Sequence, residues 1–313
     1  MRRAFVKTIT ALAEADPLLM LLTADLGFAI FDEFEKRFPR QFLNVGVAEQ
    51  NLIGTATGLA LEGRTVFAYS IGNFPTLRCL EQIRSDACYH GANVKIVTSG
   101  GGFTYGSLGM SHHVTEDLGI LRTLPGMTIV APGDAWETEE ATKALAHCKG
   151  TSYLRLEKTP GEGGREGEIF RLGKACRLRE GRDLTLIGTG GILGEALGAS
   201  RILSDEGIEC RVVSMHTLKP LDEEEILSAA EETGGIFTVE EHSVFGGLGG
   251  AVAEVCLEKN VAPGVFYRIG VRDEFSFVAG SQEFLRTRYG LDRASIAGKV
   301  KQILRRPIPI SGL

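Results

Sequence analysis

Apolar residues in the first half of the chain recur alternately with helical and strand periods. A helical pattern over residues 4–22 runs into a short buried strand over 21–26. Further expected strands are 42–47, 65–70, 93–98 and 153–156, with helices at 48–61 and 77–90, a Gly-rich loop at 99–109 and a strand-helix pair over 127–147. Strands that alternate with helices predict a parallel sheet covered on both faces.

The alternation stops at KTPGEGGREG, residues 158–167, which has the composition of an interdomain linker, and it restarts at residue 183. Strands are expected at 183–188, 210–215, 236–241 and 265–271, and helices at 195–206, after Pro220, and at 251–258. The prediction is an α/β protein with two doubly wound domains. We expect a parallel-sheet domain over 1–160, a linker over 161–180 and a smaller domain over 181–313.

Composition supports two globular domains. The chain has 313 residues, of which 43% are hydrophobic, and its net charge of −6 is spread evenly. An acidic chain without basic blocks gives a nucleic-acid backbone nothing to bind. The 40 glycines follow no fixed period, so we expect them to serve individual local structures rather than to form a repeat.

The apolar N-terminus superficially resembles a signal peptide, but Glu14 and Asp16 interrupt it. No uncharged stretch approaches the roughly 20 residues that span a bilayer, so we expect a cytoplasmic protein with no membrane contact. Six cysteines without a C-x-x-C pair indicate free thiols and no metal site in this chain.

Several chemical motifs are missing. The chain has no P-loop, no H-E-x-x-H and no G-x-S-x-G. A glycine-rich turn over 188–194 follows a strand, but its third glycine comes one place too late for the dinucleotide fingerprint. A nucleotide site and tight strand-to-helix packing both remain open for that turn.

One carboxylate opens the helix of small residues over 48–61. Glu49 there has two interpretations. An acid near a helix N-terminus stabilises the helix by about 0.3–1 kcal/mol. Its neighbours Val45, Val47, Leu52 and Ile53 are apolar, however, and would bury it as a functional acid.

Five segments in order carry a family resemblance. VGVAEQ at 45–50 resembles the glutamate helix of thiamine-diphosphate enzymes, and GMSH at 109–112 stands where that family has G-P-T-H. The other three are LTADL at 22–26, EQIR at 81–84 and VEEHSVFGGLG at 239–249. Together they are similar to the pyrimidine-binding and C-terminal domains of transketolase and deoxyxylulose-phosphate synthase.

The resemblance implies a cofactor, thiamine diphosphate, and roles around it. Glu49 would be catalytic, sharing a proton with the cofactor's pyrimidine ring and driving it to the imino form. Phe74 would stack on that ring, although ordinary core packing stays open. Asp25 would lie near the thiazolium side, with a turn cap as the alternative.

Three more residues receive substrate roles from the resemblance. His112 would handle the donor's hydroxyl protons as a catalytic and substrate-binding residue. Arg155 and Arg2 match arginines that bind a sugar phosphate. His113 receives no role. Leu108, Ala29 and Gly100 depart from the family's sugar-contacting residues, which leaves open a modified or shorter sugar.

The Mg²⁺ site of such enzymes, a G-D-G motif with an asparagine near 30 residues on, is missing. The nearest approach is GDA at 133–135, and no asparagine occurs between Asn93 and Asn260. The resemblance therefore implies one subunit of a split transketolase, silent alone, whose diphosphate-binding partner supplies Mg²⁺. Two copies would meet across a two-fold axis in a heterotetramer. A deoxyxylulose-phosphate-synthase-like or 2-oxo-acid-decarboxylating subunit and a non-catalytic regulatory homologue remain alternatives.

Overall fold

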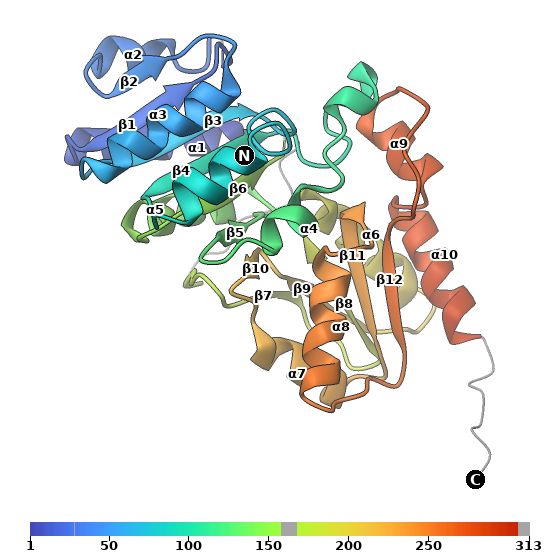
Figure 1. Ribbon diagram of the computed structural model, residues 1–313. Coiled ribbons are helices and arrows are strands. Elements are labelled where there is room, and N and C mark those ends of the chain that lie inside the picture. The colour runs from blue at the N-terminus through green and yellow to red at the C-terminus, as the bar shows by residue number, and fades with distance from the viewer. Residues whose placement is uncertain (28, 158–167, 306–313) are drawn as a thin grey trace.

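The computed structural model describes residues 1–27, 29–157 and 168–305, which form two α/β domains in contact (Figure 1). This confirms the predicted fold class. The first domain contributes β1 (Leu19–Thr23), β2 (Phe42–Asn44), β3 (Thr65–Ile71), β4 (Val94–Ser99), β5 (Thr128–Val130) and β6 (Ser152–Leu156). Its helices are α1 (Arg2–Ala15), α2 (Asp32–Arg37), α3 (Glu49–Leu61), π-helix η1 (Gln82–Cys88), 3₁₀ turns η2 (Gly106–Leu108) and η3 (Met110–His112), α4 (Asp117–Arg122) and α5 (Ala135–His147).

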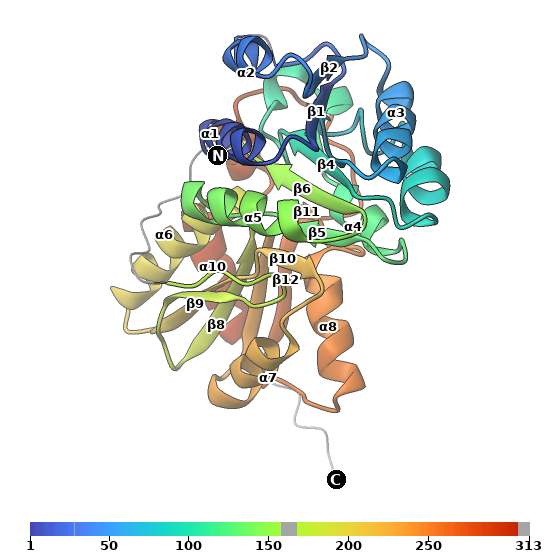
Figure 2. The ribbon, with the colours of Figure 1, turned by 90° about the vertical axis from the view of Figure 1, so that its left-hand side faces the viewer.

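The strands of the first domain are parallel, and all but the edge strand β2 are largely buried on both faces, because successive side chains alternate between two cores. Leu19 and Leu21 pack with α1 and α5, whereas Met20 and Leu22 pack with α3. In Figure 2, α1 and α5 lie to the left of the sheet and α3 to its right. The continuous apolar runs in the sequence therefore correspond to strands that helices cover on both faces.

The second domain has the sheet order β12-β11-β8-β9-β7. Its strands are β7 (Cys176–Arg179), β8 (Leu184–Thr189), β9 (Cys210–Ser214), β11 (Ile236–Ser243) and β12 (Phe266–Val271). Its helical elements are η4 (Gly190–Ile192), α6 (Leu193–Ser204), α7 (Glu223–Glu232), α8 (Leu248–Glu258), α9 (Gln282–Arg288) and α10 (Arg293–Leu304). Among the described residues, no helix is both long and apolar enough to cross a bilayer.

Two short strands lie near or across the expected division of the chain. Strand β7 lies inside the predicted linker and pairs antiparallel with β9, so the second sheet begins before residue 181. Strand β10 (Thr217–Lys219) belongs by sequence to the second domain, yet it extends the first sheet by pairing antiparallel with β5. Residues 158–167 of the predicted linker lie outside the described part.

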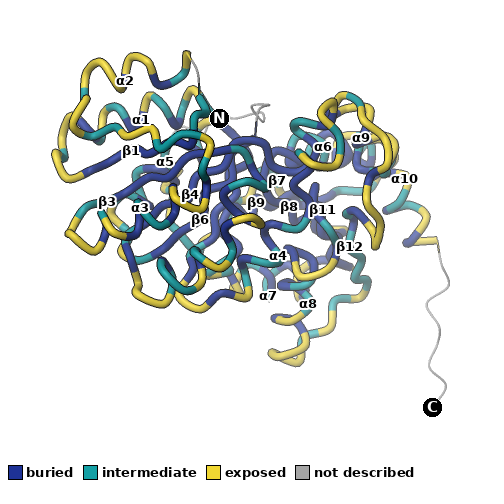
Figure 3. The backbone as a smooth tube through the Cα atoms, turned by 45° about the horizontal axis from the view of Figure 1, so that its top comes forward, coloured by how far each residue is buried: buried dark blue, intermediate teal, exposed yellow. Residues whose placement is uncertain are grey.

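One hydrophobic cluster runs through both domains. It joins Ile129 of β5 to Val213 of β9 and Leu248 of α8, all fully buried. Figure 3 shows the central strands of both sheets as a buried interior, with exposed residues mainly on helices and loops. The two domains therefore share part of their core and hold a fixed arrangement.

Lys95 is a charged residue inside this interior. Its Nζ donates to the carbonyl oxygens of Cys148 (2.6 Å) and Gly150 (2.7 Å), which follow the end of α5. Burial lowers the pKa of Lys95 from its ordinary 10.5 to about 8. The folded state therefore disfavours the charged form.

We expect this residue to make stability depend on pH. Between about pH 8 and 10.5 the unfolded chain binds the Lys95 proton more tightly, so this lysine's contribution to folding rises with pH. Relative to Lys95→Met, the wild type should gain about 2 kcal/mol in unfolding free energy from pH 7.5 to pH 10. Urea unfolding of both proteins at the two pH values measures this difference. An equal difference at both would contradict it.

Candidate active site at the carboxyl ends of the first sheet

Candidate residues collect where parallel strands end. Asp25 follows β1, Phe74 follows β3 and the loop that carries His112 follows β4, while Glu49 opens α3 after β2. These four strands are neighbours in the sheet order β4-β3-β1-β2. Ligands of open α/β sheets bind outside the carboxyl ends of the strands, which is where these residues lie.

Glu49 is a buried acid, with only 3% of the residue exposed. It is the first residue of α3, and its carboxylate accepts a hydrogen bond from Arg78 Nη1 at 2.9 Å. The Arg78 side chain is 51% exposed, so this ion pair joins a buried carboxylate to a largely solvent-accessible cation. The pKa of the neighbouring Cys79 thiol is raised to about 12, chiefly by burial and then by Glu49, so this cysteine is a poor nucleophile.

Phe74 connects Glu49 to His112. The guanidinium of Arg78 lies 4.7 Å from the centre of the Phe74 ring, and the His112 ring meets the same ring edge-on at 5.3 Å. Ser111 Oγ lies 3.0 Å from His112 Nδ1. The structure thus brings Glu49, Phe74 and His112 into one cluster through Arg78, which the sequence analysis did not identify.

His113 points the other way. It is buried against the Phe103 ring at 5.1 Å, and burial lowers its pKa. Its carbonyl accepts a hydrogen bond from Asn73 Nδ2. This residue therefore packs inside, in agreement with its lack of an expected role.

Asp25 sits in a left-handed backbone conformation (φ 54°). Its N–H donates to Asn44 Oδ1 at 2.9 Å, and Asn44 Nδ2 donates back to its carboxylate at 3.2 Å. The same Asn44 oxygen accepts from the Gly46 N–H at 3.0 Å. Asn44 therefore ties Asp25 to the turn that leads into Glu49. The sequence offered one indication of this contact, because Asn44 lies in the strand expected just before Glu49.

Arg2 lies on a different side of the strand ends. It lies close enough to Tyr69 to influence that hydroxyl, whose pKa is raised, chiefly by burial. A cavity of about 530 Å³ opens beside it and is lined by Arg2, Arg3, Val6, Lys7, Ala29 and Ile30. Three cationic side chains at one cavity suit an anionic ligand group. Ala29, one of the departures noted above, faces this cavity.

Gly100, a second departure, is explained by packing. Its φ is +100°, and a Cβ there would lie 2.2 Å from the ring of Tyr105. The Tyr105 hydroxyl lies 3.1 Å from Ser99 Oγ. Tyr105 thus covers this position, and a larger residue at 100 would displace it. Leu108, the third departure, is exposed.

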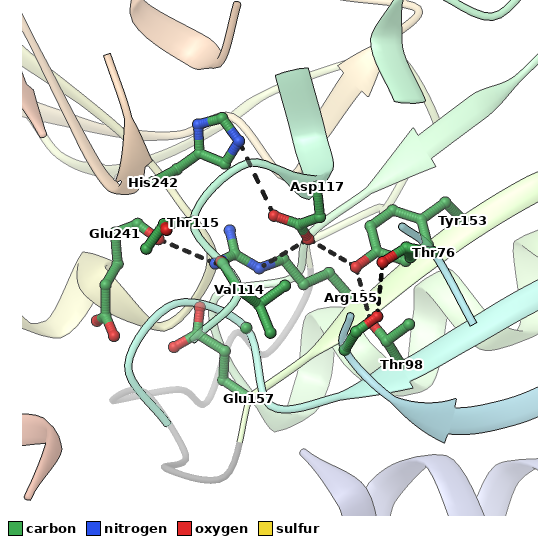
Figure 4. Close-up of polar contacts among 12 residues, drawn as sticks. Thr76, Thr98, Val114, Thr115, Asp117, Tyr153, Arg155, Glu157, Glu241 and His242 are labelled. Carbon is green, nitrogen blue, oxygen red and sulfur yellow. Dashed lines mark hydrogen bonds and ion pairs between the residues drawn. The ribbon is translucent and has the colours of Figure 1, made fainter. Parts of the chain in front are cut away.

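The expected phosphate contact of Arg155 does not fit the structure. The side chain is 1% exposed, and its Nη2 donates to the carbonyl oxygens of Val114 (3.1 Å) and Glu241 (2.9 Å). Its Nε lies 3.4 Å from the Asp117 carboxylate (Figure 4). Both domains enclose this guanidinium, so we infer a structural role for Arg155 in place of the expected phosphate contact.

Glu157 completes this enclosed charge network (Figure 4). Its pKa is raised, first by burial and then by the charge of Glu241. Asp117 accepts a hydrogen bond from the Tyr153 hydroxyl at 2.6 Å. The network joins β6, α4 and β11, and it lies between the domains rather than at the strand ends that hold Glu49.

One group of metal-ligating residue types comes together although the sequence spacing predicted none. The ligand atoms of Glu137, Cys176 and His216 all lie within 4.8 Å of one another. Two of them also have partners within the chain, since Glu137 Oε2 accepts from the Gly133 N–H at 2.6 Å and His216 Nδ1 lies 2.8 Å from Thr217 Oγ1.

The comparisons with known proteins cover almost the whole chain. Residues 1–161 match the family model described as transketolase, pyrimidine binding domain, and residues 173–296 match transketolase, C-terminal domain. A putative transketolase C-terminal section from Methanocaldococcus jannaschii is 41% identical over 310 residues, covering 98% of this chain and 96% of the relative. One of the subunits of an apulose-4-phosphate transketolase from Phocaeicola vulgatus is 39% identical, covering 97% of each.

Solved structures agree. A split-gene transketolase, described as an inactive β4 tetramer, superposes with a TM-score of 0.88 at 36% identity and covers 97% of both chains. The transketolase of Leishmania mexicana has the same fold (TM-score 0.82, 21% identity), but this chain covers only 46% of it. This chain belongs to the transketolase family, and it corresponds to the pyrimidine-binding and C-terminal domains of its members.

Proposed function

We propose that this chain is the pyrimidine-binding subunit of a two-component, thiamine-diphosphate-dependent transketolase. The observation that carries the proposal is the buried Glu49 grouped with Phe74 and His112, in a chain about half as long as a single-chain transketolase. The reaction is transfer of a two-carbon ketol unit from a ketose to an aldose. The separate diphosphate-binding subunit completes the site.

The residues present suit the pyrimidine half of the cofactor. Glu49 offers a carboxylate in a dry setting, and Phe74 offers an aromatic face for a ring to stack on. Thiamine diphosphate held here would supply the nucleophilic carbon that ketol transfer needs. Glu49 would hold a proton for the pyrimidine ring of the cofactor, and Asp25 would help to hold its thiazolium part.

His112 and Arg2 face the substrate in this proposal. His112, next to the Phe74 ring, exchanges protons with the hydroxyls of the donor sugar. Arg2 lines the cationic cavity and binds a phosphate on the sugar. The relative from P. vulgatus is named for a phosphorylated sugar, apulose 4-phosphate, which supports a sugar phosphate as substrate here.

The partner subunit provides what this chain lacks, namely the Mg²⁺ ligands and the diphosphate site. The outer face of α3 suits such a contact, because added side chains at Gly54 and Gly58 would meet nothing within 4 Å. Val47, two residues before Glu49, is 75% exposed although apolar.

Self-association of this chain is supported by the tetramer formed by the β chain of the split-gene relative. Six free cysteines support a cytoplasmic location.

The reaction class is tested by mixing this chain with the diphosphate-binding subunit that its organism encodes. We expect ketol transfer from one or more ketose phosphates to an aldose, measured by mass spectrometry of the products. Release of carbon dioxide from pyruvate without ketol transfer would instead identify a deoxyxylulose-phosphate-synthase-like or oxo-acid-decarboxylating subunit. A complex that forms but catalyses neither reaction would identify a regulatory homologue.

A further inference from the structure

The loop over residues 100–113 carries His112 and is closed at its base by the first domain. The N–H groups of Gly102 and Val114 each donate to the other residue's carbonyl at 2.9 Å. Figure 1 shows this green segment extending away from the first sheet to lie beside α9 of the second domain. Its conformation therefore depends on what the second domain offers it.

Glu241 of β11 is the main contact from that domain. Its buried carboxylate accepts the Phe103 N–H on Oε1 at 2.5 Å. Arg286 Nε donates to its other oxygen at 2.5 Å, and Gln282 Nε2 donates to Oε1 at 2.9 Å. A charged acceptor fixed by two donors of its own domain thus holds one backbone amide of the loop.

The loop is shaped to approach this carboxylate. Gly102 has a φ of +57°, and a Cβ at that position would lie 2.5 Å from Glu241 Cγ. The Phe103 ring belongs to the hydrophobic cluster of the second domain and stacks on Tyr289 at 5.2 Å. The Gly280 N–H donates to the Gly106 carbonyl at 3.2 Å. Residues 102–106 are therefore attached to the second domain as well as to their own.

The far side of the same loop reaches the candidate active site. Six residues beyond Gly106, the His112 ring contacts Phe74, and Asn73 Nδ2 bonds the Ser111 carbonyl at 3.5 Å. Neither Glu241 nor its donors take part in that cluster. A shift of residues 102–106 would move the short segment between the two anchors and His112 with it.

We propose that Glu241 is a positioning residue, through which the second domain fixes the loop that places His112 for reaction. The proposal rests on the function proposed above for His112. It gives the second domain a role in catalysis without any contact between that domain and the reacting atoms. Misplacing a catalytic group by about 1 Å lowers turnover by about 100-fold.

The test uses Glu241→Gln, with Glu254→Gln as the matched control. Glu254 also pairs across the domains, with Arg122 at 2.6 Å, but it does not contact the loop. Hydrogen exchange of the isolated chains should show amide protection over 102–106 falling by about ten-fold in Glu241→Gln only. In the reconstituted complex, kcat should fall by about 10- to 100-fold while the Kd for thiamine diphosphate stays within about two-fold.

If Glu241→Gln does not fold, Gly102→Ala takes its place, because its added Cβ would push the loop away from the Glu241 side chain. Unchanged loop protection would overturn the proposal. So would an unchanged kcat after protection is lost, or equal losses in the Glu254→Gln control. An inactive wild-type complex would refute the proposed function instead, and the exchange result alone would then decide whether Glu241 holds the loop.

Discussion

Glu49→Gln should lower turnover of the reconstituted complex by about 1,000-fold, because an amide cannot exchange a proton with the pyrimidine nitrogen. Assembly should be unaffected, since glutamine has nearly the same size and can retain the bond from Arg78. Steady-state kinetics measures the first effect, and sedimentation of the complex measures the second.

Glu62→Gln is the control for this prediction. Glu62 is the exposed residue that ends the same helix, so its substitution changes the charge of α3 without touching the candidate site. We expect turnover within about two-fold of wild type. A Glu49→Gln complex that also retained turnover within a few-fold would remove Glu49 from the mechanism.

Arg155→Met should destabilise the folded chain by about 3–5 kcal/mol, because it removes the cation nearest the buried Asp117 carboxylate. It also removes two hydrogen bonds, from the Arg155 side chain on β6 to the backbone carbonyl oxygens of Val114 and Glu241 (Figure 4). Urea unfolding measures the loss. Arg122→Met, which breaks the more accessible ion pair with Glu254, should cost at most about 1 kcal/mol.

The opposite pattern would restore the role first expected for Arg155. If it bound a sugar phosphate, Arg155→Met would raise the KM for the donor and leave the unfolding free energy within about 1 kcal/mol of wild type. The two measurements on one variant therefore separate a structural arginine from a substrate contact.

Local sequence patterns were sufficient to predict the long buried strands and most of the helices. Apolar runs such as 93–98 predicted strands because both faces of the first sheet are buried. Strands β7 and β10 were missed for a physical reason. They have four and three residues, and each pairs antiparallel at a sheet edge, where neither length nor alternation is distinctive.

The candidate site divides in the same way. The burial of Glu49 could be predicted from the residues next to it in the sequence, because apolar residues around an acid indicate burial. Arg155 carries no such signal, since the groups that enclose it come from residues 41 and 86 positions away. The contact of Glu241 with Phe103 spans 138 positions. Contacts of this kind depend on how two domains meet, which no local pattern encodes.

The central claim is that this chain supplies half of an active site, and comparing it alone and with its partner tests that claim most directly. Calorimetry with thiamine diphosphate and Mg²⁺, followed by a ketol-transfer assay, should detect neither tight binding nor turnover for the chain alone. Both should appear when the diphosphate-binding subunit is added. Tight Mg²⁺-dependent binding together with turnover by the chain alone would contradict the claim.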